Sequence, residues 1–187
     1  MQNPQPQPDG SNEIARLQSA VEELSVTIEN NPDDADAYYR RGVIYGQLVE
    51  PLAAIRDFDQ VVRLDPKNAE AYYNRGLAYI HLKEHLPAVE DFTQAIQLNP
   101  DHVDAYNNRA ASLWDLGRPQ QALKDVDQAI KLNDQIPSAY AIRALANTYL
   151  GDDDTAKADA EKASQLGFDG DLLRHFIRQA ERQRKST

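Results

Sequence analysis

Residues 35–68, ADAYYRRGVIYGQLVEPLAAIRDFDQVVRLDPKN, decide the fold. Small or aromatic side chains recur in the first half of this stretch at Tyr38, Gly42 and Tyr45. These positions are four and three residues apart, so they share one face of a helix. The first half of the stretch therefore predicts an amphipathic helix.

The second half of the same stretch predicts another helix. Ala54, Phe58 and Val61 repeat the spacing of four and three residues. Pro51 suits a first helical turn, where the N–H that proline lacks would have no acceptor anyway. Pro66 cannot continue the helical hydrogen bonds, so it ends the helix. Residues 35–68 are therefore expected to form a helix–turn–helix hairpin.

This hairpin recurs along the chain at one unbroken interval, the separation of Tyr38 from Tyr72. Four residue types keep the interval through four successive units. The series are Tyr38, Tyr72, Tyr106 and Tyr140; Arg41, Arg75, Arg109 and Arg143; Ala54, Ala88, Ala122 and Ala156; and Asp57, Asp91, Asp125 and Asp159. A period of this length is typical of stacked hairpins, each of which buries its apolar face only against a neighbour.

The units resemble the tetratricopeptide repeat, in which an aromatic residue, Gly or Ala, Tyr, Ala, Phe, Ala and a terminal Pro stand at set positions. The four repeats are residues 35–68, 69–102, 103–136 and 137–170. The resemblance implies an all-α fold. We expect a right-handed α-solenoid of four helix–turn–helix units, with a capping helix at each end.

The segment before the first repeat is expected to be half a repeat. Residues 12–34 match a second repeat helix, and the prolines at positions 4, 6 and 8 exclude a first helix before it. Residues 1–11 are expected to form a disordered tail rich in Pro and Gln. Residues 12–34 are therefore predicted to cap the array at its N-terminus.

The segment after the last repeat is expected to close the other end. Residues 171–187 predict a capping helix with a basic tail, as solenoids need a polar outer face at each end. The apolar face consists of Leu172, Leu173, Phe176, Ile177 and Ala180, and Arg174, Arg178 and Arg182 lie opposite.

The arginine and aspartate series predict one ion pair in each repeat. Arg41 and Asp57 stand at equal distances from the turn near Val49, so two antiparallel helices bring them to the same height. The expected pairs are Arg41–Asp57, Arg75–Asp91, Arg109–Asp125 and Arg143–Asp159. The alternative is an arginine ladder that grips an acidic ligand.

In the tetratricopeptide family the first helix of each repeat lines a concave groove. The inward positions carried over from the family include Asp36 and Gly46. The residues selected for peptide binding are Tyr39, Arg40, Glu70, Tyr73, Asn74, Leu77, Asp104, Asn107, Asn108, Trp114 and Tyr149. An asparagine side chain both donates and accepts, so Asn74 and Asn108 are candidates for holding a peptide backbone; otherwise they are exposed polar residues. Trp114 is either a groove anchor or a packing residue between repeats.

The charge distribution favours a neutral or basic partner. The net charge is −10, and residues 1–170 hold 15 Lys/Arg against 28 Asp/Glu. An acidic body repels phosphate backbones, which argues against nucleic acid as the main ligand. We find no apolar run that would span a membrane and no signal-peptide pattern in residues 1–10, so a cytoplasmic location is expected.

One apparent metal motif is set aside. His81 to His85 reads H-x-x-E-H, which resembles a zinc-protease signature, but it spans the turn of the second repeat and not a continuous helix. The sequence also lacks a phosphate loop, a dinucleotide fingerprint and a nucleophile elbow. We expect no metal, no cofactor and no enzymatic activity.

These features predict a scaffold or adaptor that binds an extended peptide or a helix of another protein in its concave groove. The first alternative is a self-associating homo-oligomer in which the C-terminal helix or the N-terminal tail docks in a neighbouring copy. The second alternative is an accessory domain of an enzyme system.

Overall fold

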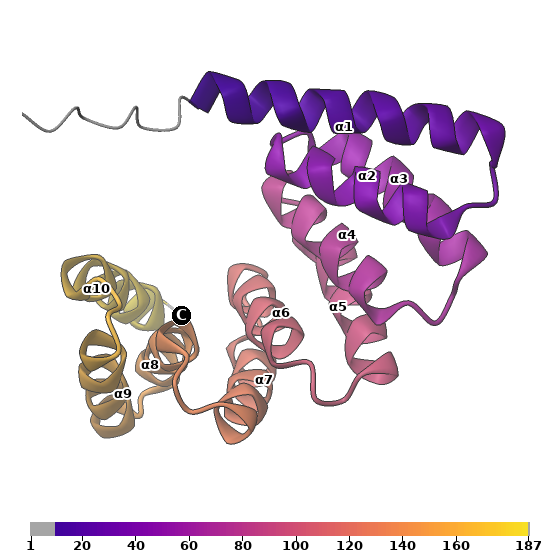
Figure 1. Ribbon diagram of the computed structural model, residues 1–187. Helices are drawn as coiled ribbons and strands as arrows, with labels where there is room; N and C mark the ends of the chain where they lie inside the picture. Colours follow the sequence, from indigo (N-terminus) through magenta and orange to yellow (C-terminus); the bar gives the residue numbers. More distant parts are fainter. Residues whose placement is uncertain (1–9, 187) are drawn as a thin grey trace, which may run out of the picture.

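The computed structural model describes residues 10–186 of the chain. This part of the protein forms ten helices and no strand, arranged along an arc (Figure 1). The helices are α1 (Gly10–Asn30), α2 (Ala35–Gln47), α3 (Pro51–Leu64), α4 (Ala69–His81), α5 (His85–Leu98), α6 (Val103–Asp115), α7 (Pro119–Leu132), α8 (Pro137–Leu150), α9 (Asp153–Gln165) and α10 (Gly170–Ser186). The predicted all-α solenoid of helical hairpins is confirmed.

The first helices of the hairpins lie on the inner side of the arc. Besides the contacts between consecutive helices, α2 touches α4, α6 touches α8, and α8 touches α10. The second helices make no comparable contact with one another over residues 10–186. Elements on the inside of a curved stack approach each other, so α2, α4, α6 and α8 line the concave surface.

The turns inside the hairpins share one backbone conformation. Each of these turns contains a residue with a positive φ: 57° at Val49, 58° at Lys83, 69° at Gly117 and 93° at Gly151. These positions follow one another at the interval of the repeat. Glycine adopts this conformation at little cost, whereas a β-branched residue such as Val49 is strained there. The turn conformation is therefore kept at Val49, although a β-branched residue disfavours it.

The second and third hairpins close on two different pairs of side-chain volumes. In the second hairpin Gly76 faces the buried Phe92, and a Cβ atom on Gly76 would stand 2.7 Å from the Phe92 ring. In the third hairpin the same two positions hold Ala110 and Val126, and both are fully buried. From the second to the third hairpin, the residue on the first helix becomes larger (Gly to Ala) and the residue on the second helix becomes smaller (Phe to Val).

The arginine of each repeat ties three helices together. Arg75 donates from Nε and Nη2 to both carboxylate oxygens of Asp91, at 2.8 and 2.6 Å. Its Nη1 donates to Asp59 of the preceding hairpin at 2.6 Å, and its guanidinium lies 5.5 Å from the centre of the Tyr72 ring. Hydrogen bonding to Asp91 raises the pKa of Arg75. Burial raises the pKa of Asp91, although the hydrogen bonds from Arg75 oppose that shift.

All four pairs expected from the sequence form in this way. The others are Arg41–Asp57, Arg109–Asp125 and Arg143–Asp159, each with an N–O distance of 2.7 Å. The acceptor on the preceding helix belongs to a further series at the same interval, which the sequence analysis missed: Ser25, Asp59, Thr93 and Asp127. The arginine thus links neighbouring hairpins as well as the two helices of its own hairpin.

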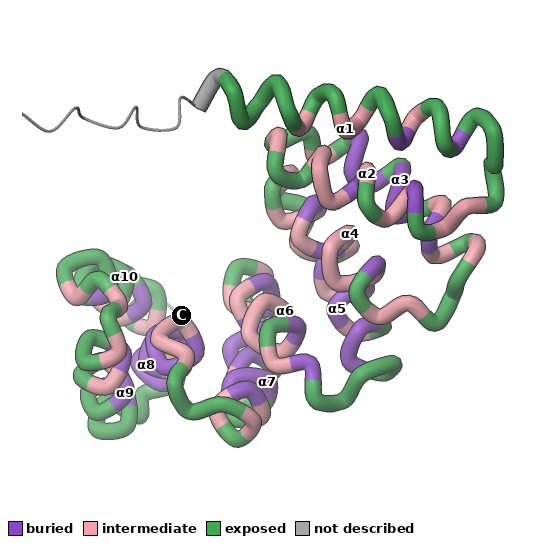
Figure 2. Tube along the Cα trace, viewed as in Figure 1, coloured by how far each residue is buried: buried purple, intermediate pink, exposed green. Residues whose placement is uncertain are grey.

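The N-terminal helix begins earlier than expected. Helix α1 includes Gly10 and Ser11, which were assigned to the disordered tail; residues 1–9 of that tail lie outside the described residues. Ser25 of α1 accepts from Arg41 as Asp59 accepts from Arg75, so α1 occupies the place of a second repeat helix. Its opposite face is exposed (Figure 2).

The C-terminal helix divides its apolar residues between core and solvent. Leu173 and Ala180 are buried, whereas Leu172 and Phe176 are 45% and 38% exposed. Helix α10 packs mainly on α8 and only lightly on α9. Arg184 anchors its end by donating to Asp153 at 2.8 Å. The expected single apolar face is therefore wider than the interface that it makes.

Candidate functional site: the concave surface

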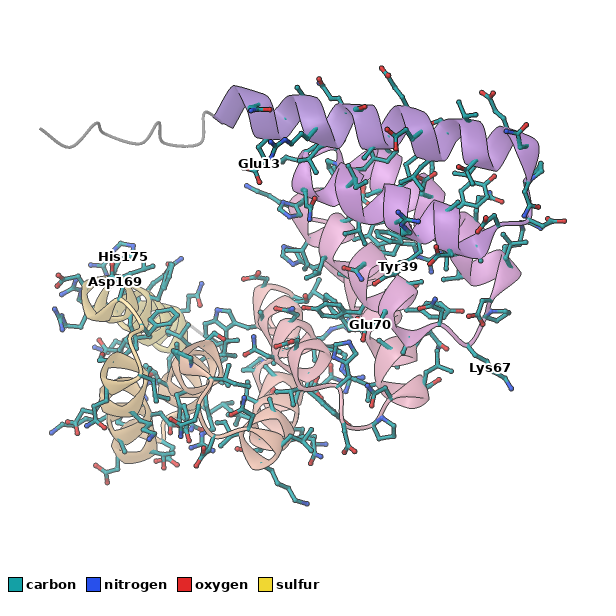
Figure 3. All side chains as sticks on the ribbon, viewed as in Figure 1. Glu13, Tyr39, Lys67, Glu70, Asp169 and His175 are labelled. Carbon is teal, nitrogen blue, oxygen red and sulfur yellow. The ribbon has the colours of Figure 1, made fainter. Side chains whose placement is uncertain are left out.

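An acidic edge runs along the N-terminal ends of the inner helices. Asp36, Glu70 and Asp104 take the second position of α2, α4 and α6, and all three are exposed. Carboxylates are stabilised there by the helix dipole. Arg40 is exposed on the same side, and its Nη1 lies 3.8 Å from Asp36 Oδ2. Tyr39 and Glu70 mark two neighbouring inner helices in Figure 3.

Behind this edge, tyrosines and asparagines of adjacent repeats bind one another. Asn74 Nδ2 donates to Tyr39 Oη at 3.1 Å, and Asn108 Nδ2 donates to Tyr73 Oη at 3.1 Å. Asn74 Nδ2 also donates to the Glu70 carbonyl at 2.8 Å, so both of its N–H groups are used within the protein. Asn74 and Asn108, the two candidates for holding a peptide backbone, are therefore partly engaged by the chain itself. Asn74 Oδ1 is the remaining hydrogen-bonding atom of this side chain.

His102 belongs to this surface, although the sequence analysis did not select it. It is 9% exposed, and its ring lies 4.5 Å from the Tyr73 ring. Its Nδ1 accepts from the Ala105 N–H, and its Nε2 lies 3.6 Å from Glu70 Oε1. A signal for it exists in the repeat, since the side chains that cap the inner helices keep the repeat interval: Asp34, Asn68 and His102.

The electrostatic environment of the surface is negative. Burial raises the pKa of Tyr73 to about 12, and the charges of Asp104 and Glu70 add to the shift. Burial also raises the pKa of Tyr39, with Glu70 contributing in the same sense. Nearby negative charge disfavours a tyrosinate and favours a cation.

An apolar cavity opens between the first and second repeats. Its volume is about 260 Å³, and its walls come from α2, α3 and α4. Val43, Leu77 and Phe58 supply apolar surface, and Asn74 lies at its margin. Gly46 leaves this space empty, because an added Cβ would meet nothing within 4 Å. The same offset holds Trp114 in the third repeat, so the cavity is specific to this end of the groove.

A second pocket lies at the other end of the surface. It measures about 570 Å³ and is lined by Trp114, Asp115 and Tyr149 from the repeats and by Phe176 from α10. The Trp114 and Tyr149 rings meet edge to face, with centroids 6.2 Å apart and an interplanar angle of 86°. Trp114 also packs against the cores of the third and fourth repeats. It therefore takes part both in packing between repeats and in lining the concave surface.

The fourth repeat offers little open surface. Its inward positions Ala141, Ile142, Leu145 and Thr148 are buried, and α8 is buried along most of its length (Figure 2). Leu145 packs in one cluster with Leu173 and Ile177 of α10. Asn107 is also engaged, since its Oδ1 accepts from Ser138 Oγ at 3.1 Å. Among the residues selected in this region, Tyr149 remains half-exposed.

The two histidines of the apparent metal motif lie on different helices. His81 is the last residue of α4 and His85 the first residue of α5. His85 Nδ1 lies 3.6 Å from Asp115 Oδ2. Over the described residues, no group of three or more His, Asp or Glu side chains is arranged to hold a metal ion. No helix between residues 10 and 186 combines the length and apolar character needed to cross a membrane.

Family models match most of the repeat region. The model described as tetratricopeptide repeat matches residues 69–102, and a second with the same description matches residues 87–135 and 108–165. A model described as TPR repeat matches residues 53–82. Together these matches extend over more than half of the chain. No curated protein sequence matches the chain.

Solved structures share the fold at low sequence identity. The crystal structure of MamA superposes with a TM-score of 0.79 at 24% identity, covering 88% of this chain and 96% of MamA. YrrB, described as a TPR protein with an unusual peptide-binding site, gives 0.71 at 23% identity over 79% of this chain and 76% of its own. The first TPR of Spaghetti (RPAP3), bound to the HSP90 peptide SRMEEVD, gives 0.61 at 26% identity over 63% and 93%.

Proposed function

Because this chain belongs to the tetratricopeptide repeat family, whose members are typically protein-interaction modules, we propose that it binds a segment of another protein along its concave surface. In this role the chain is an adaptor or scaffold and carries out no catalysis. The segment lies across α2, α4 and α6, where the inner surface is open.

The observation that carries this proposal is the cavity at Gly46. A space of about 260 Å³ walled by Val43, Leu77 and Phe58 fits one apolar side chain of a ligand. Buried apolar anchors of this kind supply much of the affinity of peptide complexes. Asn74 Oδ1 at the cavity margin is placed to accept a backbone N–H from the same segment.

The charge of the surface selects the kind of segment. The edge formed by Asp36, Glu70 and Asp104 attracts a basic segment and repels an acidic one. The RPAP3 repeat is bound to SRMEEVD, which carries three carboxylate side chains. We propose the opposite preference here, for a neutral or basic segment with an apolar anchor residue.

The first test fills the cavity without harming the fold. Gly46→Leu adds a side chain where no atom lies within 4 Å of the new Cβ, and leucine is the better helix former. The native protein and this variant are used to capture partners from a lysate of the source organism, and mass spectrometry identifies them. We expect a partner that the native protein retains and Gly46→Leu loses by at least about tenfold.

The matched control is Gln94→Leu, which adds a leucine at an exposed position of α5 that is not part of the cavity. This control should retain the partner. Equal capture by the native protein and Gly46→Leu would place binding elsewhere. Capture of the chain alone would favour self-association, for which the exposed Leu172 and Phe176 of α10 are one candidate surface.

A further inference from the structure

The pocket at the C-terminal end of the concave surface has three aromatic walls from three helices. Trp114 comes from α6, Tyr149 from α8 and Phe176 from α10. Trp114 and Tyr149 meet at 86°, an arrangement in which one ring presents its edge to the other. The electron-rich face of an aromatic ring attracts a cation. Aromatic geometry alone, however, would also suit an apolar ligand.

The charge at the pocket distinguishes a cationic ligand from an apolar one. Asp115 is the one charged side chain among the described lining residues, and it is 52% exposed. The helix dipoles do not add to this charge, because the C-terminus of α6 at Asp115 and the N-terminus of α7 at Pro119 both lie at the pocket. Arg184 is paired with Asp153 at 2.8 Å and also donates to the Thr148 carbonyl in the last turn of α8 at 3.0 Å. The described lining of the pocket is thus aromatic and carries one exposed carboxylate.

We propose that this pocket binds the cationic side chain, Arg or Lys, of the partner segment. The cation lies against the aromatic rings, and Asp115 balances its charge. The amide of Gln179 lines the same pocket and supplies an acceptor for a guanidinium or ammonium N–H. This site rests on the proposed function, because the cation is taken to belong to a bound segment. It lies two repeats away from the cavity at Gly46.

The chain contains its own probe for this test. Trp114 is the single tryptophan of the protein and lines this pocket, so its fluorescence reports on binding there. The full-length protein is titrated with the peptide acetyl-Gly-Gly-Arg-Gly-Gly-amide and with the same peptide carrying citrulline, which has nearly the shape of arginine and no charge. We expect saturable quenching by the arginine peptide at a concentration about tenfold lower than by the citrulline peptide.

Two substitutions separate charge from packing. Asp115→Asn removes the charge, and Phe176→Leu removes one ring while keeping an apolar side chain. Each substitution should weaken the binding of the arginine peptide about tenfold. Asp101→Asn is the matched control: it removes one negative charge from the exposed loop at the opposite end of α6 and should change nothing. Circular dichroism checks that all variants keep the native helix content.

Three results would overturn the proposal. They are equal binding of the citrulline and arginine peptides, equal effects of Asp115→Asn and Asp101→Asn, and preferential binding of a peptide with the sequence of residues 1–9. The last result would identify the proline-rich segment of the chain as the occupant. If Gly46→Leu loses its partner while the arginine peptide leaves the fluorescence of Trp114 unchanged, the proposed binding along the concave surface is supported and the proposed cation site is wrong.

Discussion

At the scale of single residues, the fold depends on how closely two helices approach inside a hairpin. Gly76 lets α4 contact the ring of Phe92, and the third hairpin reaches the same result with Ala110 and Val126. Interiors are close-packed, so a change on one helix requires a compensating change on the other. The second and third hairpins of this chain therefore pack the same two positions with different pairs of side chains.

We predict that Gly76→Ala and Phe92→Val are strongly coupled. Gly76→Ala alone should destabilise by about 1 kcal/mol, because the overpacking exceeds the gain in helix propensity. Phe92→Val alone should cost about 2–3 kcal/mol through the cavity that it leaves. The double variant copies the third hairpin and should be more stable than the sum of the two effects by about 1 kcal/mol or more.

Urea unfolding of the four proteins measures this coupling. A cycle whose two effects add within about 0.5 kcal/mol would contradict the volume exchange. Leu173, which is buried on α10, supplies the control: Leu173→Ala should add to Gly76→Ala without coupling, because its core cluster contains no residue of the second hairpin.

At the scale of helices, the repeat arginine binds an aspartate of its own hairpin and an acceptor on the preceding helix. We call this arrangement the arginine clamp. Arg75 is bound by a buried acceptor, Asp91, and by a half-exposed one, Asp59. Removal of one partner from a buried pair leaves an uncompensated charge, whereas an exposed pair contributes little. The two acceptors should therefore differ in what their loss costs.

We predict that Asp91→Ala lowers the free energy of unfolding by about 3 kcal/mol and that Asp59→Ala lowers it by at most about 1 kcal/mol. Thermal and urea unfolding of both variants measure the difference. Similar losses for the two variants would mean that the pairing within a hairpin is no stronger than the link between hairpins. An unchanged melting temperature in Asp91→Ala would reject the clamp altogether.

At the scale of the whole molecule, the burial of tyrosines on the concave surface makes the array sensitive to alkali. Tyr73 and Tyr39 accept hydrogen bonds from the following repeat, and burial raises the pKa of both. The folded protein holds the Tyr73 proton up to about pH 12, whereas the unfolded chain releases it from about pH 10. The folded state therefore binds more protons than the unfolded state over this range.

We predict that the melting temperature falls as the pH rises from about 10 to 12. The stability linked to the protonated Tyr73 should be fully present below about pH 10 and lost above it. Tyr73→Phe should melt at a lower temperature at neutral pH, because Asn108 loses its acceptor. Its melting temperature should fall less steeply over the alkaline range. A slope equal to that of the native protein would show that Tyr73 does not titrate in the way described.

Most of the architecture could be predicted from the sequence, because it depends on spacing along the chain. The constant interval between equivalent residues indicates stacked hairpins, and the symmetry of Arg75 and Asp91 about a turn places them at the same height. The link to Asp59 was missed although it follows the same interval, since its partner lies on another hairpin. The acceptor series was visible in the sequence, but its geometry was not.

Local periodicity was sufficient to predict stacked helical hairpins, because it dictates which residues share a helix face. The inner helices and the acidic edge followed from the resemblance to the tetratricopeptide repeat. Which parts of the surface are open became clear only from the folded arrangement. Helix α10 covers the fourth repeat, Asn74 binds Tyr39, and the space beside Gly46 stays empty. These outcomes depend on how side chains from separate repeats fill a common volume. Spacing along the chain does not specify that volume.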